Sequence, residues 1–144
     1  KDLKIEGLRS NHIASVASEI AEIKEVRDLL YGFQKGFPEK HGDCVLDGRD
    51  IGTRIFPDAK VKLYIDASLP IRAKRRFDEL VRNSKESDLH KITRDLRERD
   101  LRDSKRKSAP LKISEDAHLI DTTELSIQTS IEKAIEIVRL QTSH

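Results

Sequence analysis

Three short apolar runs, each followed by an aspartate, constrain the fold of this 144-residue chain more than any other feature. They cover residues 44–46, 61–65 and 117–120, and they end at Asp47, Asp66 and Asp121. Short strands that alternate with helical segments are typical of a parallel sheet with helical crossovers. The pattern therefore predicts the α/β class. Such sheets usually hold about five or six strands, so we expect further strands N-terminal to this sequence.

Four segments are predicted to be helical, and they cover residues 12–35, 70–82, 88–106 and the stretch around 127–138. In the first, Ile13, Ala17 and Ile20 begin a set of apolar residues that recurs near a 3.6-residue period. Gly36-Phe37-Pro38 is expected to end that helix. Pro70 suits the first turn of the second helix. Cys44 lies in the first predicted strand, where we expect it to be a small buried apolar residue.

Composition limits the classes of protein that this chain can belong to. A length of 144 residues predicts about one domain, with 36% hydrophobic and 38% charged residues. No apolar run approaches the roughly 20 residues of a membrane span, and we find no secretory signal. The single cysteine cannot form an internal disulfide, and the five histidines have no zinc-site spacing. We therefore expect a soluble, cytoplasmic monomer without a membrane partner.

The loop after the first predicted strand carries the densest chemistry, in the heptapeptide Asp47-Gly48-Arg49-Asp50-Ile51-Gly52-Thr53. In open α/β sheets, ligands bind beyond the carboxyl ends of the strands. Glycines let a backbone approach a ligand closely, and Arg49 can hold a phosphate through two parallel hydrogen bonds. Asp47 can orient a hydrated Mg²⁺. A tight turn with a surface ion pair is the alternative interpretation.

Positive charge is concentrated in residues 72–107, which hold 14 Lys/Arg against 8 Asp/Glu. Arg99, Asp103 and Arg106 are spaced to lie on one face of a helix, with Arg102 beside them. Two guanidinium groups that flank a carboxylate can hold a phosphate and a ribose hydroxyl together. A solvated helix crossed by salt bridges is the alternative.

A second basic cluster, Arg72-Ala73-Lys74-Arg75-Arg76, could close over a nucleoside triphosphate and neutralise charge on a transferring phosphoryl group. A basic helix face or a nucleic-acid patch are the alternatives. Nucleic acid is less favoured because acidic residues interleave throughout and aromatic residues, at 4% of the chain, are scarce.

Taken together, these motifs resemble the cytidylate kinase family, within the nucleoside monophosphate kinase superfamily. The resemblance covers nearly the whole chain and includes Asp47-Gly-Arg-Asp-Ile-Gly-Thr53 and Phe56-Pro-Asp-Ala59. Its most specific part is Arg99-Asp-Leu-Arg-Asp-Ser-Lys-Arg106, followed by Ile120-Asp-Thr-Thr-Glu-Leu-Ser126. The resemblance implies a P-loop NTPase-like, three-layer α/β/α fold with a parallel sheet. We expect a single domain with four regions, at residues 1–42, 43–70, 71–110 and 111–144, of which 71–110 forms the lid and its flanking charged helices.

The resemblance also implies roles in binding CMP. Ser18, Arg27 and Asp50 match residues that read the cytosine edge. Arg99 and Asp103 match residues that hold the ribose hydroxyls, with Arg99 also near phosphate. Arg49 and Arg106 match phosphate clamps. The residues expected to act in catalysis are Arg49, Arg99, Arg106 and Asp47.

The implied reaction is transfer of the γ-phosphoryl group of ATP to CMP or dCMP, with Mg²⁺ as the cofactor. Asp47 looks like the carboxylate that orients Mg²⁺ through water. Arg72, Arg75 and Arg76 fall in the lid region that closes over ATP. Phosphoryl transfer requires alignment and positive charge around the transferred group rather than covalent chemistry from the protein.

One family motif is not found in these residues. The phosphate-binding pattern Gly-x-x-x-x-Gly-Lys-[Ser/Thr] does not occur in the 144 residues, and neither does methionine. In the family that pattern lies upstream of the point where this sequence begins. We therefore expect that an N-terminal segment is missing, and that these 144 residues alone would fold poorly and be inactive.

Three other functions remain open at this stage. A kinase for another monophosphate, such as UMP, would share most of the motifs. A non-catalytic CMP-binding protein would lack the phosphate loop by nature. A nucleic-acid-binding module built on residues 72–107 would bind oligonucleotides with a strong salt dependence.

Overall fold

The computed structural model describes residues 11–83, 86–107 and 109–143, so the first ten residues of the predicted region 1–42 lie outside the described part. Within it the chain forms five α-helices, two strands and one π-helical turn. The elements are, in order, α1 (Asn11–Ile20), α2 (Lys24–His41), η1 (Ile51–Ile55), β1 (Leu63–Asp66), α3 (Leu69–Arg82), α4 (Leu89–Lys105), β2 (His118–Asp121) and α5 (Ile127–Thr142).

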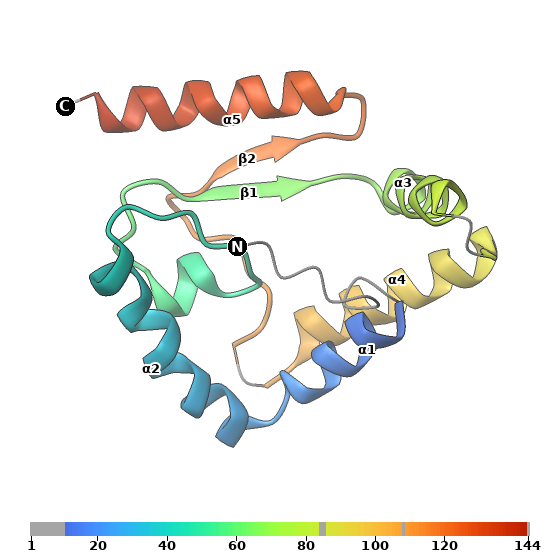
Figure 1. Cartoon of the computed structure of the whole chain (residues 1–144), viewed down its shortest axis with the longest axis horizontal. Coiled ribbons are helices and arrows are strands. Elements are labelled where there is room, and N and C mark those ends of the chain that lie inside the picture. Colours follow the sequence, from blue (N-terminus) through green and yellow to red (C-terminus); the bar gives the residue numbers. More distant parts are fainter. Residues whose placement is uncertain (1–10, 84–85, 108, 144) are drawn as a thin grey trace.

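The two strands pair in parallel, in a register that places Leu63 beside His118 and Asp66 beside Asp121. Helices α3 and α4 form the crossover between them, and α5 packs against β2 (Figure 1). The predicted alternation of strands and helices is therefore confirmed for two of the three predicted strands. Both of these strands end on the expected aspartate, at the same edge of the sheet.

The first predicted strand, at residues 44–46, is wrong. These residues form no strand, Cys44 is exposed, and Val45 is 99% exposed. A strand is stabilised by hydrogen bonds to a neighbouring strand, and within the described residues the sheet contains only β1 and β2. The apolar run therefore forms an irregular segment, and Cys44 does not have the buried role that was predicted for it.

The first predicted helix is two helices, and it continues past the expected stop. Residues between Ile20 and Lys24 break the helix, with Ile23 in an extended conformation (φ −77°, ψ 113°). Both halves keep a helical apolar period, so periodicity alone does not reveal the bend. Pro38 lies inside α2, and the helix ends only at His41. The next residue, Gly42, caps it: its φ of 74° favours glycine, and its N–H donates to the Pro38 carbonyl.

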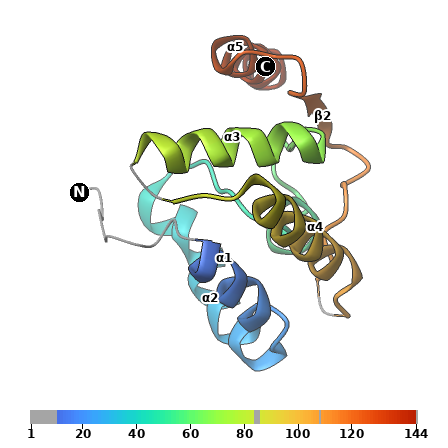
Figure 2. The ribbon, with the colours of Figure 1, turned by 90° about the vertical axis from the view of Figure 1, so that its right-hand side faces the viewer.

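Helices α3 and α4 match the predicted segments closely and pack against each other; Figure 2 shows α3 above α4. Pro70 occupies the first turn of α3, as predicted. Arg72 joins the two helices through a bidentate ion pair with Asp100, in which Nη1 lies 3.0 Å from Oδ1 and Nη2 lies 2.8 Å from Oδ2. The buried apolar residues are few and aliphatic, namely Ile55, Ala67, Ala73, Ile92 and Ile120.

The remaining contacts bring four segments together below the sheet. Helix α1 packs against α4, and α2 contacts η1 (Figure 1). Residues 47–50 lead directly into η1, so this loop lies close to α2. Within the described residues, no helix combines the length and the apolar character that crossing a membrane requires.

The first prediction concerns the start of α4. The Asp88 carboxylate accepts hydrogen bonds from the N–H groups of His90 (2.8 Å) and Lys91 (3.3 Å), and so caps the helix. We expect Asp88→Ala to lower the free energy of unfolding by about 1 kcal/mol, the usual value of such a cap. Urea denaturation measures this change. The control Glu86→Ala, two residues upstream and exposed, should change stability by less than about 0.5 kcal/mol, and equal losses in both variants would show that the cap contributes nothing.

Candidate functional site

The residues predicted to bind CMP meet in one place. Ser18 comes from α1, Arg27 from α2, and Arg49 and Asp50 from the loop before η1. The last turns of α4 and the residue after it supply Arg99, Asp103 and Arg106. Four separate segments of the chain therefore contribute to a single cluster, which we call the arginine–aspartate cluster.

Asp103 is the centre of the first half of this cluster. Its side chain is 3% exposed. One carboxylate oxygen accepts a hydrogen bond from Ser18 Oγ at 2.8 Å, and the other accepts from Arg49 Nε at 2.9 Å. Arg99 Nε lies 3.7 Å from the same oxygen as Arg49. The alternative of a fully solvated helix face is therefore wrong at Asp103.

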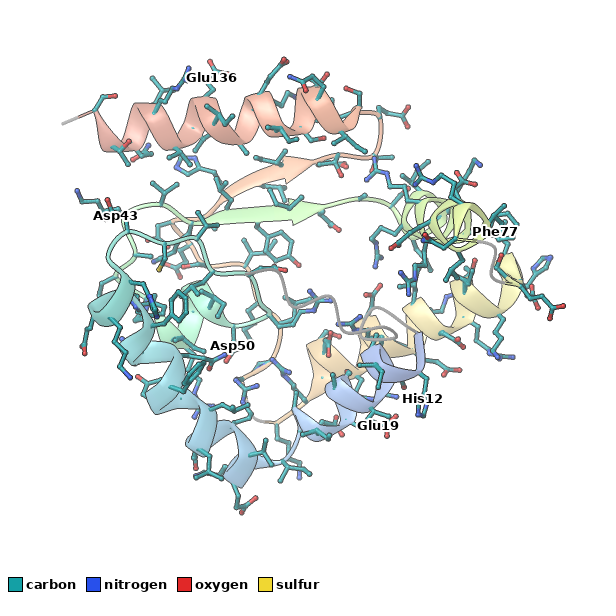
Figure 3. The ribbon with its side chains drawn as sticks, in the orientation of Figure 1. His12, Glu19, Asp43, Asp50, Phe77 and Glu136 are labelled. Carbon is teal, nitrogen blue, oxygen red and sulfur yellow. The ribbon has the colours of Figure 1, made fainter. Side chains whose placement is uncertain are left out.

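Asp50 is the centre of the second half. Arg27 Nη2 pairs with Asp50 Oδ2, and Arg106 Nη2 lies 3.7 Å from Asp50 Oδ1. Exposures of 8% for Asp50 and 3% for Arg106 place both side chains in the interior. Figure 3 shows Asp50 on the inner side of α2. The Asp50 carbonyl also accepts from the N–H of Arg54 at 2.9 Å, so η1 fixes the backbone that carries this carboxylate.

Several guanidinium nitrogens of the site are buried without a hydrogen-bond partner among the described residues. They are Arg27 Nε, Arg99 Nε, Arg102 Nη1 and Arg106 Nη2. A buried donor without an acceptor costs about 1–3 kcal/mol. An anionic ligand that accepts from these groups would recover that free energy. The cluster therefore has the donors of an anion site.

Arg102 is the member of this set that the sequence analysis left without a role. It is three residues from Arg99 and four from Arg106, so the helical spacing could have identified it. Its Nη2 lies 3.8 Å from Glu19 Oε1 on α1, which links α4 to α1 beside Ser18.

The charge balance of the cluster favours a doubly charged anion. Among the described residues, the ion pairs of Arg27, Arg49, Arg99 and Arg106 within the cluster are with two carboxylates, Asp50 and Asp103. Burial lowers the pKa of Arg99 and of Arg106, and the neighbouring guanidinium groups of Arg49 and Arg27 lower these pKa values further. Arginine nevertheless stays protonated in proteins. A phosphate monoester carries about −1.5 to −2 charges at neutral pH, which matches the excess.

Asp47 and the two glycines of the heptapeptide lie beside this cluster. Asp47 is exposed and lines a small cleft of about 150 Å³ between the loop and β1. It is the only carboxylate among the described residues that line the cleft, and no group of three metal-ligating residues occurs in the described chain. One carboxylate fits Mg²⁺ that is bound mainly by water and substrate phosphates.

The glycines have a packing role within the protein itself. A Cβ on Gly48 would lie 2.8 Å from Ile51 Cγ1, and a Cβ on Gly52 would lie 3.3 Å from Lys62 Cδ. Neither glycine has a positive φ. Side chains of this chain therefore occupy the space that the two missing Cβ atoms leave.

The guanidinium groups of Arg72 and Arg75 are both engaged by the protein. Arg72 pairs with Asp100 and donates from Nε to the Ala67 carbonyl at 2.8 Å. Arg75 donates to Thr122 Oγ1 at 3.0 Å and to the Thr122 carbonyl at 2.6 Å. In this structure both residues tie α3 to the ends of the strands, and their contact with ATP stays a prediction.

Arg76 has a different position. It pairs with Glu79 at 2.7 Å on its own helix. With Arg99 and Arg102 it also lines a cleft of about 700 Å³ between α1, α3 and α4. Of the three arginines predicted to face ATP, Arg76 alone lines this cleft within the described residues.

This chain is similar to known proteins over most of its length. The family model for cytidylate kinase matches residues 1–140. A cytidylate kinase of Cereibacter sphaeroides is 47% identical over 140 residues, which cover 97% of this chain and 68% of that protein.

Other relatives give similar figures. A cytidylate kinase of Rhizobium meliloti is 46% identical over 131 residues, covering 91% of this chain and 62% of the relative. One of Bartonella henselae is 45% identical, covering 91% and 61%. This chain therefore spans about two thirds of the length of its relatives, and it belongs to the cytidylate kinase family of nucleoside monophosphate kinases.

Proposed function

We propose that this protein is a phosphotransferase that moves the γ-phosphoryl group of ATP to CMP or dCMP, giving ADP and CDP or dCDP. The observation that carries the proposal is the arginine–aspartate cluster, in which buried carboxylates and an excess of guanidinium groups converge from four segments. Family membership supports the same reaction.

In this proposal, Asp50 and Arg27 read the base. Cytosine presents an amino group and ring acceptors along its pairing edge, and a carboxylate accepts well from the cytosine amino group. Uracil presents a carbonyl oxygen at that position, which a carboxylate cannot pair with. The Arg27–Asp50 pair therefore favours cytosine, because a wrong base would leave buried polar groups unpaired.

Asp103 and Arg99 would hold the ribose hydroxyls, and Arg49 and Arg106 would hold the phosphate. Asp103 already accepts from Ser18 and Arg49, so a bound nucleotide would exchange partners with groups that are oriented in advance. Arg49, whose side chain is 40% exposed, would exchange its hydrogen bond to Asp103 for one to the phosphate. Arg106 is fixed by its Nε hydrogen bond to the Ala109 carbonyl at 2.5 Å.

The transfer step would use this fixed geometry. Arg49, Arg99 and Arg106 would align the acceptor phosphate and spread the negative charge that develops on the transferred group. Asp47 would hold a water ligand of Mg²⁺. When bound with ATP, Mg²⁺ supplies charge neutralisation between the phosphates. Arg72, Arg75 and Arg76 belong to the helix pair that we propose as the lid over ATP.

Binding and transfer can be tested separately on the chain as it is. Because the pattern Gly-x-x-x-x-Gly-Lys-[Ser/Thr] does not occur in the 144 residues, we expect CMP binding without production of ADP. Isothermal titration with CMP, UMP and AMP, beside an ADP-release assay with Mg²⁺-ATP, measures both. Equal affinity for the three monophosphates would contradict the proposal. Preference for UMP would instead support a kinase of another specificity.

Asp50→Asn should change base selectivity. An amide that can donate as well as accept no longer discriminates against the uracil carbonyl, so we expect the CMP-over-UMP affinity ratio to fall at least about 10-fold. Titration of each nucleotide gives the ratio, which a partial loss of folded protein leaves unchanged. The exposed Asp58→Asn serves as the control. An unaltered ratio in the Asp50 variant would refute the base-reading role.

Arg106→Gln should weaken the hold on phosphate and leave the nucleoside part of binding intact. Charge-assisted hydrogen bonds contribute about 1.5–3 kcal/mol, so we expect CMP affinity to fall by roughly 10- to 100-fold. Affinity for cytidine, which has no phosphate, should stay within about 2-fold. Lys105→Gln, an exposed neighbour, is the matched control. If CMP and cytidine lose affinity equally, Arg106 is not a phosphate clamp.

A further inference from the structure

Lys62 is a buried cation outside the arginine–aspartate cluster. It lies just before β1, and its side chain is 7% exposed. Its Nζ donates to the Pro57 carbonyl and to Asp116 Oδ2, the latter at 2.6 Å. Burial of an ammonium group is costly unless it is paired and hydrogen-bonded, so these two acceptors explain why the group can be buried at all.

Asp116 is held in place from two sides. Lys62 donates to one carboxylate oxygen, and Ser114 Oγ donates to the other at 2.5 Å. The hydrogen bond from Lys62, followed by the one from Ser114, lowers the pKa of Asp116 to about 2. Because this pKa is depressed, the ionised Asp116 stabilises the folded state at neutral pH, and this stabilisation is lost only as the pH falls through about 2. The ion pair is therefore intact at neutral pH.

The stem of Lys62 packs against the loop that carries Arg49 and Asp50. A Cβ on Gly52 would lie 3.3 Å from Lys62 Cδ and 3.5 Å from Lys62 Cγ. Pro57, which accepts from Nζ, follows the end of η1. Lys62 thus contacts the chain within η1 and beyond its end, and both contacts fix the turn that follows Asp50.

Asp116 belongs to the segment that leads from α4 to β2. The beginning of that segment is bound to residues of the cluster, since Arg106 Nε donates to the Ala109 carbonyl and Leu111 N–H donates to the Asp103 carbonyl at 2.7 Å. The Lys62–Asp116 pair therefore joins the Asp50 loop to the segment that is tied to Asp103 and Arg106.

We propose that Lys62 and Asp116 form a positioning pair that holds Arg49 and Asp50 in register with Asp103 and Arg106. The loop that carries Arg49 and Asp50 also contacts the end of α4 directly, through Arg49–Asp103 at 2.9 Å and Arg106–Asp50 at 3.7 Å. A bound nucleotide would compete for those contacts, whereas the Lys62–Asp116 pair lies outside them and persists. This inference rests on the proposed CMP site.

The test is a double-mutant cycle on CMP and UMP binding. Asp116→Asn keeps the shape of a side chain that is 63% exposed, so it should fold, and Lys62→Met removes the buried charge. We expect CMP affinity to fall about 5-fold in Asp116→Asn and about 10-fold in Lys62→Met. Residues that act as one unit are non-additive, so the double variant should bind CMP no more weakly than Lys62→Met alone.

A general loss of stability would not change the ratio of CMP affinity to UMP affinity. We expect this ratio to fall in both single variants. Lys60→Met and Glu115→Gln, both exposed neighbours, should leave the affinity and the ratio unchanged. An unaltered ratio in Asp116→Asn, or additive effects in the double variant, would overturn the positioning role. Absence of CMP binding by the unmodified chain, once circular dichroism has shown that it is folded, would instead overturn the proposed function, and this inference with it.

Discussion

The burial of Asp50 and Asp103 is the constraint on which the rest of the structure depends. A buried carboxylate requires cationic or hydrogen-bonding partners, and these two recruit them from distant parts of the chain. Asp50 draws in Arg27 from α2 and Arg106 from the end of α4, and Asp103 draws in Arg49 from the loop and Ser18 from α1. Few apolar side chains are fully buried in the described chain, so charge pairing accounts for much of how α1, α2 and α4 are placed around the loop.

The same pairing explains why such a cluster suits a ligand. Arginines in excess of carboxylates leave buried N–H groups without acceptors, which costs free energy in the protein alone. The protein tolerates that cost because the carboxylates hold the guanidinium groups apart and oriented. A dianionic phosphate would supply the missing acceptors, and a base with a donor group would pair with Asp50. The same side chains therefore stabilise the fold and recognise the ligand. A bound ligand would replace some of their hydrogen-bond partners, and the site is already formed without it.

The sequence predicts best the features that neighbouring residues determine, such as the bounds of a helix. Pro70 marks the start of α3, and both α3 and α4 lie within about two residues of their predicted bounds. The one-face spacing is confirmed for Arg99 and Asp103, whereas Arg106 lies one residue past the end of α4 with a non-helical ψ of 141°. The strand at 44–46 is wrong because pairing with another strand is a non-local property that an apolar run does not encode. The Lys62–Asp116 pair escaped prediction for the same reason, since 54 residues separate its members.

Within the heptapeptide 47–53, some residues belong to the candidate ligand site and others pack against the rest of the protein. The sequence favours a ligand-contact role for its glycines, yet Ile51 and the Lys62 stem occupy the space beside Gly48 and Gly52. The charged residues Arg49 and Asp50 meet partners from α2 and α4. A Cβ at Gly52 would lie 3.3 Å from Lys62 Cδ, so the Lys62 stem would have to shift by a few tenths of an ångström to accommodate it. The two glycines therefore leave room for side chains that support the loop. The position in which the loop holds Asp50 depends on Lys62, which lies outside the motif.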